Sequence, residues 1–211
     1  MRAYRRGNLT GPIGGFALSA AAIISGCTMT MTFPLEATID RPPSVTPVPL
    51  AVGVYYSPEF RAYEHVRVRQ KMRFVAPFGQ ASVALFDRVL PMIFEGVVPV
   101  ASPPPLGEGG PKLAAVIEPK IEAFDFDWPV VLAFGAYTAE VTYRFTLYSP
   151  EGNPFASWTV RGDGNPVGLQ AGVPKAIDLA MEDAAKKFMA GFRDVPEVRR
   201  WLRQAGIPDA Q

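Results

Sequence analysis

The sequence has 211 residues, 48% of them hydrophobic, and a formal net charge of +1, with one cysteine and one histidine. This length fits one domain with additional terminal segments, and the hydrophobic content is sufficient for a buried core. The chain has no block of lysines and arginines, which excludes the basic footprint typical of nucleic-acid-binding proteins. One cysteine and one histidine exclude the usual zinc patterns. We therefore expect no nucleic-acid partner, no metal site and no cofactor.

Residues 1–26 are organised like an export signal. Arg2, Arg5 and Arg6 precede the uncharged stretch 11–24, which is shorter than the roughly 20 apolar residues that span a bilayer. A basic region followed by a short apolar region predicts a secretory signal peptide that is removed from the mature chain. The arginine pair also raises the twin-arginine export route as an alternative, but the residues after it match that signal poorly.

The signal ends in Ile24, Ser25, Gly26 and Cys27. This order of aliphatic, small, small and cysteine resembles the lipobox of bacterial lipoproteins. The resemblance implies that the Cys27 sulfur receives a diacylglycerol, that cleavage occurs before Cys27, and that the new N-terminus receives a further acyl chain such as palmitate. Two or more acyl chains anchor a protein stably. The alternative is an ordinary signal peptide, or an uncleaved helix, that happens to precede a cysteine.

The rest of the chain divides by composition. Residues 28–49 are rich in proline and have little periodicity, which predicts an extended, semi-rigid tether of about 3.1 Å per residue. The alternative is that part of this segment packs on the domain through Phe33 and Leu35. The predicted organisation is a signal peptide at 1–26, a lipidated cysteine and tether at 27–49, a folded domain at 50–205 and a C-terminal tail at 206–211.

Hydrophobic periodicity predicts the elements of the domain. Alternation predicts strands at 50–57, 65–74, 139–147 and 155–162, and the segment 149–154 predicts a hairpin turn. A strand over 113–128 changes the parity of its apolar residues, and a bulge near Ala123 would reconcile its two halves. Helical periodicity predicts helices at 81–94, with Pro91 kinking the last turn and Gly96 beyond its end, and at 175–192.

A last short helix is expected after Asp194 as its cap, with Pro196 in its first turn and Gly206 at its end. The order of elements favours an α+β fold, with a single mixed or antiparallel sheet of about five strands and two main helices packed on one face.

The sequence offers little for catalysis. His65 begins a predicted strand among arginines, and we interpret it as a surface or edge residue rather than a catalytic base. The segment 162–168 resembles a dinucleotide fingerprint, but Val167 occupies the place of a required glycine, so we interpret this segment as a loop. We expect no catalytic residues, and a hydrolase remains only as a third alternative.

Two segments are candidates for binding. Aromatic side chains gather within fourteen residues and either fill the core or form an exposed lip for lipid, peptidoglycan or a partner protein. Cationic side chains alternate with apolar ones along 65–74 and form either a binding surface for anionic groups or a solvated sheet edge. The candidate residues are Phe124, Phe126, Trp128, Phe134 and Tyr137 for the aromatic surface, and Arg67, Arg69, Lys71 and Arg73 for the cationic surface.

The lipobox, the proline-rich segment, the strand at 52–57, the turn at 149–154 and the alanine-rich helix at 176–192 together resemble small envelope lipoproteins of Gram-negative bacteria. The resemblance is to the YajG-like group and, more loosely, to auxiliary lipoproteins of ABC-type envelope transport. It implies a membrane-anchored periplasmic lipoprotein that serves as a non-catalytic interaction or assembly module. The alternative is a lipid- or glycolipid-binding auxiliary subunit of a transport system. Thr28, rather than aspartate, after the cysteine favours the outer membrane.

Overall fold

The structure is a computed structural model that describes residues 29–39, 45–69, 71–107, 112–129, 136–167 and 172–208. The lipobox with Cys27, as well as Phe134, lies outside the described residues. The elements are β1 (Met29–Thr32), β2 (Val48–Val54), α1 (Pro58–Arg61), β3 (His65–Arg69), β4 (Met72–Ala76), α2 (Phe78–Ile93), β5 (Phe94–Pro99), β6 (Ala115–Asp127), β7 (Thr138–Tyr148), β8 (Pro154–Gly164), α3 (Val173–Gly191), a 3-10 turn (Phe192–Asp194) and α4 (Pro196–Gln204).

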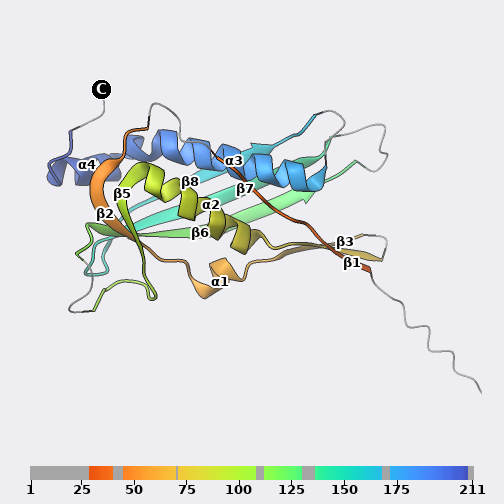
Figure 1. Ribbon diagram of the computed structural model, residues 1–211, viewed down its shortest axis with the longest axis horizontal. Helices are drawn as coiled ribbons and strands as arrows, with labels where there is room; N and C mark the ends of the chain where they lie inside the picture. Colours follow the sequence, from red (N-terminus) through yellow and green to blue (C-terminus); the bar gives the residue numbers. More distant parts are fainter. Residues whose placement is uncertain are drawn as a thin grey trace, which may run out of the picture.

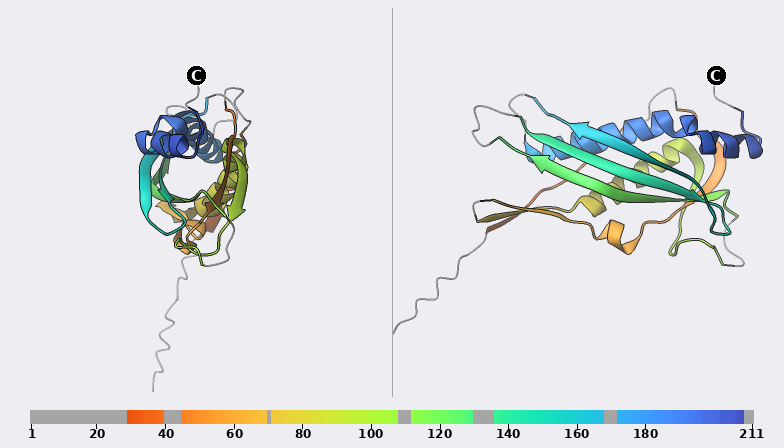
Figure 2. Two further views of the ribbon diagram at one scale, coloured as in Figure 1. Left: turned by 90° about the vertical axis from the view of Figure 1, so that its left-hand side faces the viewer. Right: turned by 180° about the vertical axis from the view of Figure 1, so that it is seen from behind.

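The main layer is a five-stranded sheet in the order β5-β2-β6-β7-β8. Strand β2 runs parallel to β5 and β6, whereas β6, β7 and β8 form an antiparallel meander. Helices α2 and α3 lie side by side on one face of this sheet, as Figures 1 and 2 show. The predicted α+β class with two main helices on one face is therefore confirmed, and the register shift between Ile121 and Ala123 in β6 confirms the predicted bulge.

The prediction of a single sheet is wrong, because a second, three-stranded sheet in the order β1-β4-β3 lies beside the first. We call it the small sheet. The predicted strand 65–74 is in fact the hairpin of β3 and β4, with Lys71 at a φ of 65° in its turn. Figure 1 shows the small sheet projecting at one end of the molecule, while α4 lies at the other end.

The N-terminal segment also differs from the predicted extended tether. The described parts of 28–49 do not form a free tether: β1 pairs with β4 in parallel, and Phe33 is buried and donates its backbone N–H to the Val75 carbonyl at 2.9 Å. The backbone N–H of Glu36 then donates to the Asp178 carboxylate of α3 at 3.1 Å. The alternative that this segment packs on the domain is what the structure shows, because its apolar side chains gain burial against the core.

The predicted end of α2 differs as well. Strand β5 begins at Phe94 directly after α2, so Gly96 lies inside a strand rather than beyond the helix, and the ideal Cβ position at Gly96 lies 3.0 Å from the Ala51 side chain. At the C-terminal end, Val195 rather than Asp194 caps α4, and Asp194 pairs with Arg199 at 3.4 Å.

Helix α3 packs directly on β8 through two glycines. A Cβ atom at Gly162 would lie 2.1 Å from the Ala180 carbonyl oxygen, and one at Gly164 would lie 1.9 Å from the Ala176 carbonyl oxygen. Between them, the backbone N–H of Asp163 donates to the Asp183 carboxylate at 3.0 Å. These glycines therefore end a strand rather than form a loop, and they allow close helix-to-sheet packing.

The core between the helices and the sheet contains a buried polar pair. Ser82 of α2 donates its hydroxyl to the Phe78 carbonyl at 2.7 Å, so the Tyr143 hydroxyl, also 2.7 Å away, donates to Ser82. Burial raises the pKa of Tyr143 far above its usual value, and the phenol stays neutral. The pair thereby satisfies both hydroxyls inside an otherwise apolar layer.

Candidate functional site

The two sheets meet where β6 ends beneath the small sheet. Phe126 lies at the centre of this junction, with only 2% of its surface exposed. Its ring centroid lies 5.7 Å from that of Phe33, 5.3 Å from the imidazole of His65 and 5.7 Å from the indole of Trp128. The junction therefore joins the start of the domain, β3 and the end of β6 through one aromatic ring.

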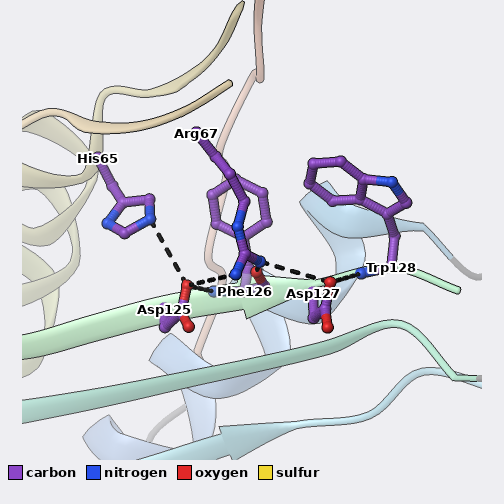
Figure 3. A network of polar contacts seen from close by, with 6 residues as sticks. All are labelled: His65, Arg67, Asp125, Phe126, Asp127 and Trp128. Atoms are coloured by element: carbon purple, nitrogen blue, oxygen red, sulfur yellow. Dashed lines mark hydrogen bonds and ion pairs between the residues drawn. The ribbon is translucent and has the colours of Figure 1, made fainter. Parts of the chain in front are cut away.

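Arg67 of β3 links the small sheet to the end of β6 (Figure 3). Its Nη1 donates to the Phe126 carbonyl and lies 3.4 Å from Asp127 Oδ1, while its Nη2 lies 3.7 Å from Asp125 Oδ1. The guanidinium carbon lies 5.7 Å from the ring centroids of Phe126 and Trp128. Because two carboxylates and two aromatic faces already surround Arg67, its charge is compensated within the molecule.

The neighbouring arginine also packs on an aromatic ring. The guanidinium carbon of Arg69 lies 5.1 Å from the Trp128 ring centroid, and Phe74 of β4 lies 4.8 Å from the same indole. Trp128 is therefore held between the two sheets by β3 and β4 together. Its backbone N–H donates to the Asp127 carboxylate at 2.8 Å.

His65 is packed into the same junction. Its ring lies 5.1 Å from Phe124 in an edge-to-face arrangement, and its Nε2 lies 3.6 Å from Asp125 Oδ1. Burial lowers the pKa of His65 and the cation of Arg67 adds to this, whereas Asp125 opposes the shift. The imidazole is therefore neutral at pH 7, and its aromatic contacts indicate a packing role.

The structure places the predicted aromatic residues mainly in the core. Phe124 and Phe126 are buried, and Trp128 and Tyr137 are half-buried and pack against the core. Phe134 lies outside the described residues. The alternative of an exposed aromatic lip is thus wrong for Phe124 and Phe126, because β6 turns both side chains toward the helices and the small sheet.

The predicted cationic surface is also divided by the hairpin. Arg67 and Arg69 face the aromatic junction, Lys71 is exposed in the turn, and Arg73 lies opposite Val68 on the other face of the small sheet. The correction follows from the turn, because a chain reversal breaks the alternation that a continuous strand would have kept. These four side chains therefore do not form one binding face.

A hollow of about 260 Å³ lies beside the junction, at the end of β6, β7 and β8. It is lined by Asp125, Asp127, Glu140 and Asp163. Arg161 forms ion pairs with Glu140 and with Asp163, and Lys187 lies 3.6 Å from Asp163. No group of three metal-ligating side chains capable of holding an ion is found among the residues that the structure describes.

The small sheet carries an apolar surface that the sequence did not predict. Of the described residues, five large hydrophobic side chains are exposed, and four of them belong to this sheet. We call these four the small-sheet tip: Met29 (64% exposed), Met31 (40%), Val66 (41%) and Val68 (66%). The pattern of 65–74 predicts Val66 and Val68 on the apolar, inward face of a strand, but the structure turns the half-buried arginine side of β3 toward the aromatic junction instead.

A second accessible surface is the edge of β8. The backbone N–H of Asp163 donates to the Asp183 carboxylate of α3 and therefore points away from β7. In an antiparallel ladder the N–H groups of every second residue point the same way, so those of Ser157 and Thr159 also point away from β7. A groove of about 400 Å³ follows this edge between Trp158 and Val195. Its rim also carries Arg161, Lys187 and Asp194.

None of the helices in the described part of the chain has the length and apolar character needed to span a bilayer.

Comparisons with known proteins give matches only among solved structures, since no family model and no curated protein matches the sequence. A Xanthomonas campestris protein described with the family model DUF330 superposes with a TM-score of 0.52 at 12% identity, over 83% of this chain and 99% of that chain. A minor lipoprotein from Acinetobacter baumannii gives a TM-score of 0.40 at 10% identity, over 79% of this chain and 99% of that one.

A hypothetical protein from Chlamydia trachomatis gives 0.39 at 8% identity, over 71% and 98%. At such low identity the first likeness shows a shared fold alone, and the other two carry no argument. None of the three is described as a YajG-like protein.

Proposed function

We propose that this protein is a lipid-anchored lipoprotein of the cell envelope, which faces the periplasm from the outer membrane. The observation that carries the proposal is the position of Cys27, which follows an export signal and an aliphatic-small-small triplet and stands two residues before the first strand. Acylation of Cys27 would hold the folded domain at a membrane. The fold shared with the DUF330 protein is compatible with this proposal and does not by itself supply a function.

We propose further that the protein acts without catalysis, as an interaction or assembly module. The only histidine is packed between phenylalanines, and the acidic hollow is lined by carboxylates that pair with arginine and lysine. A general base needs a nucleophile or a proton within hydrogen-bond reach, and the polar partner of His65 is the carboxylate of Asp125. These arrangements favour a structural use of the polar groups over a catalytic one.

The alternative of a lipid- or glycolipid-binding subunit is less favoured. In this alternative, the lipid binds to the aromatic segment 124–137 or to the cationic residues of 67–73. Phe124 and Phe126 are buried, and Arg67 is compensated by two carboxylates, so the groups that this alternative requires are already engaged.

The partner surface that we propose is the edge of β8 with its groove. An edge strand with outward N–H and C=O groups can accept an extended segment of another protein as an additional strand. Trp158 and Val195 offer apolar contacts for the side chains of that segment. We therefore expect the partner to be an envelope protein that contributes an extended segment.

Cys27→Ser tests the anchor. The unchanged protein is expected in the membrane fraction, with acyl chains on Cys27 in its intact mass. The variant, placed behind a leader that ordinary signal peptidase removes, is expected in the soluble periplasmic fraction. Thr28→Ser is the matched control and should remain acylated and membrane-bound. Firm retention of the cleaved Cys27→Ser chain in the membrane, or an unmodified Cys27 in the mature protein, would contradict the anchor.

Thr159→Pro tests the partner surface. Proline removes an N–H that faces away from β7, so the β7–β8 ladder is kept while an added strand loses a hydrogen bond and meets the pyrrolidine ring. After cross-linking in cells and affinity purification, we expect Thr159→Pro to recover at least about tenfold less of the partner that the unchanged protein recovers, since one lost interface anchor often exceeds 1.4 kcal/mol. Thr159→Ala, which keeps the N–H, should recover the partner fully. Equal recovery by both variants, at equal thermal stability, would exclude this edge.

A further inference from the structure

We infer that the small-sheet tip lies against an anionic membrane surface and fixes the orientation of the domain on the bilayer. The inference rests on the proposed anchor at Cys27 and goes beyond it. An acyl anchor alone holds one end of the chain near lipid, whereas the tip adds a second contact that keeps the molecule from pivoting freely.

The connection between the anchor and the tip is very short. Met29 begins β1 and pairs with Met72, the first residue after the β3–β4 turn, so the chain enters the small sheet at its outer end. Only Thr28 lies between Cys27 and Met29, and covalent geometry limits the distance between their Cα atoms to about 7 Å. A lipid on Cys27 therefore brings the outer end of the small sheet to the level of the lipid headgroups.

The tip exposes apolar side chains on both faces of the small sheet. Val68 lies opposite Arg73 on one face, and Met29 lies beside Met72 on the other. Met29 and Val68 are each about two-thirds exposed, at 64% and 66%. Each face therefore exposes two apolar side chains of the tip, Val66 and Val68 on one face and Met29 and Met31 on the other, and apolar side chains can insert at the boundary between headgroups and acyl chains.

The charge of the small sheet suits an anionic surface. Its strands and its turn carry arginine and lysine residues but no aspartate or glutamate: β1 is MTMT, β3 is HVRVR and β4 is MRFVA. Arg67 is compensated by β6, but Lys71 is exposed and Arg73 lies on the face away from the aromatic junction. A cation near a membrane rich in anionic lipid strengthens binding by about 1 kcal/mol, which is about fivefold.

Figure 2 shows that the small sheet diverges from the five-stranded sheet at this end of the molecule. The edge of β8 from Ser157 to Thr159 lies nearer the opposite end, because β8 ends at Gly164 beside the junction. Contact of the tip with lipid would therefore leave the proposed partner surface free and directed away from the bilayer.

The test uses the acylated mature protein in vesicles of phosphatidylethanolamine and phosphatidylglycerol. Because Cys27 is the only cysteine and its sulfur would be acylated, a Val68→Cys substitution offers one free thiol for an environment-sensitive fluorophore. We expect this label to emit at shorter wavelength and to be quenched by spin-labelled lipids. The matched control, Thr159→Cys with the same label, should emit as in water and escape quenching.

A charge variant completes the test. Lys71→Gln with Arg73→Gln should lower the equilibrium constant for contact of the Val68 label with lipid by about twenty-five-fold, at about fivefold for each charge. Lys112→Gln with Lys186→Gln, which changes two exposed cations elsewhere, should leave the label in lipid.

The outcomes separate the two proposals. A protein that carries acyl chains and floats with the vesicles, but whose Val68 label behaves like the Thr159 label, overturns this inference and leaves the anchor standing. The same result with protection of Val68 only in the presence of a purified envelope protein assigns the tip to that partner and also overturns it. A protein without acyl chains that stays off the vesicles contradicts the proposed function itself.

Discussion

Gly164→Val is expected to lower the free energy of unfolding by at least about 3 kcal/mol, which is a large share of the roughly 5–15 kcal/mol that stabilises a typical domain. The Cβ of any side chain at this position would lie 1.9 Å from the Ala176 carbonyl oxygen and 2.7 Å from the Ala180 backbone nitrogen. Both atoms belong to the backbone of α3 and cannot rotate away. The helix must therefore separate from β8, and the buried surfaces of Ala176 and Ala180 lose their packing.

Urea denaturation followed by circular dichroism measures this effect. The midpoint should fall at an unchanged slope, or the variant should lack the cooperative transition altogether. Gly191→Ala is the matched control, because nothing lies within 4 Å of an added Cβ there. Its stability should stay the same or rise by up to about 1 kcal/mol, since alanine restricts the unfolded chain. Equal stability of Gly164→Val and the unchanged protein would mean that α3 does not pack on β8 as described.

Phe126→Ala is expected to cost about 3–5 kcal/mol and to loosen the small sheet from the rest of the domain. The ring is 2% exposed and contacts Phe33, His65 and Trp128, so its removal leaves a cavity between the two sheets. Arg67 would also lose one of its two aromatic faces. Local detachment should therefore accompany the global loss of stability.

Hydrogen exchange separates these two effects. Amides of β3 and β4 should exchange faster in Phe126→Ala under conditions in which α3 remains protected. Phe155→Ala is the matched control, because Phe155 is a half-buried phenylalanine whose ring lies 5.6 Å from Trp201 of α4, away from the junction. Its cost should be smaller, and exchange in the small sheet should not change. Unaltered exchange of β3 and β4 in Phe126→Ala would contradict the role of this ring.

The elements with long, regular periodicity were predictable from the sequence. Alternation over 139–147 marks β7, and the alanine-rich stripe over 175–192 marks α3, because each pattern extends over several turns or pleats of a single element. The bulge near Ala123 was also predictable, since a change of apolar parity inside one strand requires an extra residue. These features depend on local spacing, which the sequence states directly.

The features that were missed depend on contacts between distant segments. The alternation over 65–74 is the same for one strand as for a hairpin until the turn at Lys71 is known. Arginines on its inner face were unexpected, because their burial depends on Asp125 and Asp127, some sixty residues later. Strand β1 was missed although methionine and threonine alternate there, because the alternation covers only four residues of a proline-rich segment and its partner β4 lies about forty residues away.

The place of β1 bears on how the mature chain can be shortened. The proline-rich composition of 28–49 suggests a dispensable linker, but removing residues up to about 44 would take away β1, the strand that covers one side of β4. An uncovered strand next to exposed Val66 and Val68 can pair with another copy of the chain, and aggregation would follow. Protein that begins at Cys27 or Thr28 retains β1, whereas a shorter chain would show the aggregation caused by the uncovered edge of β4.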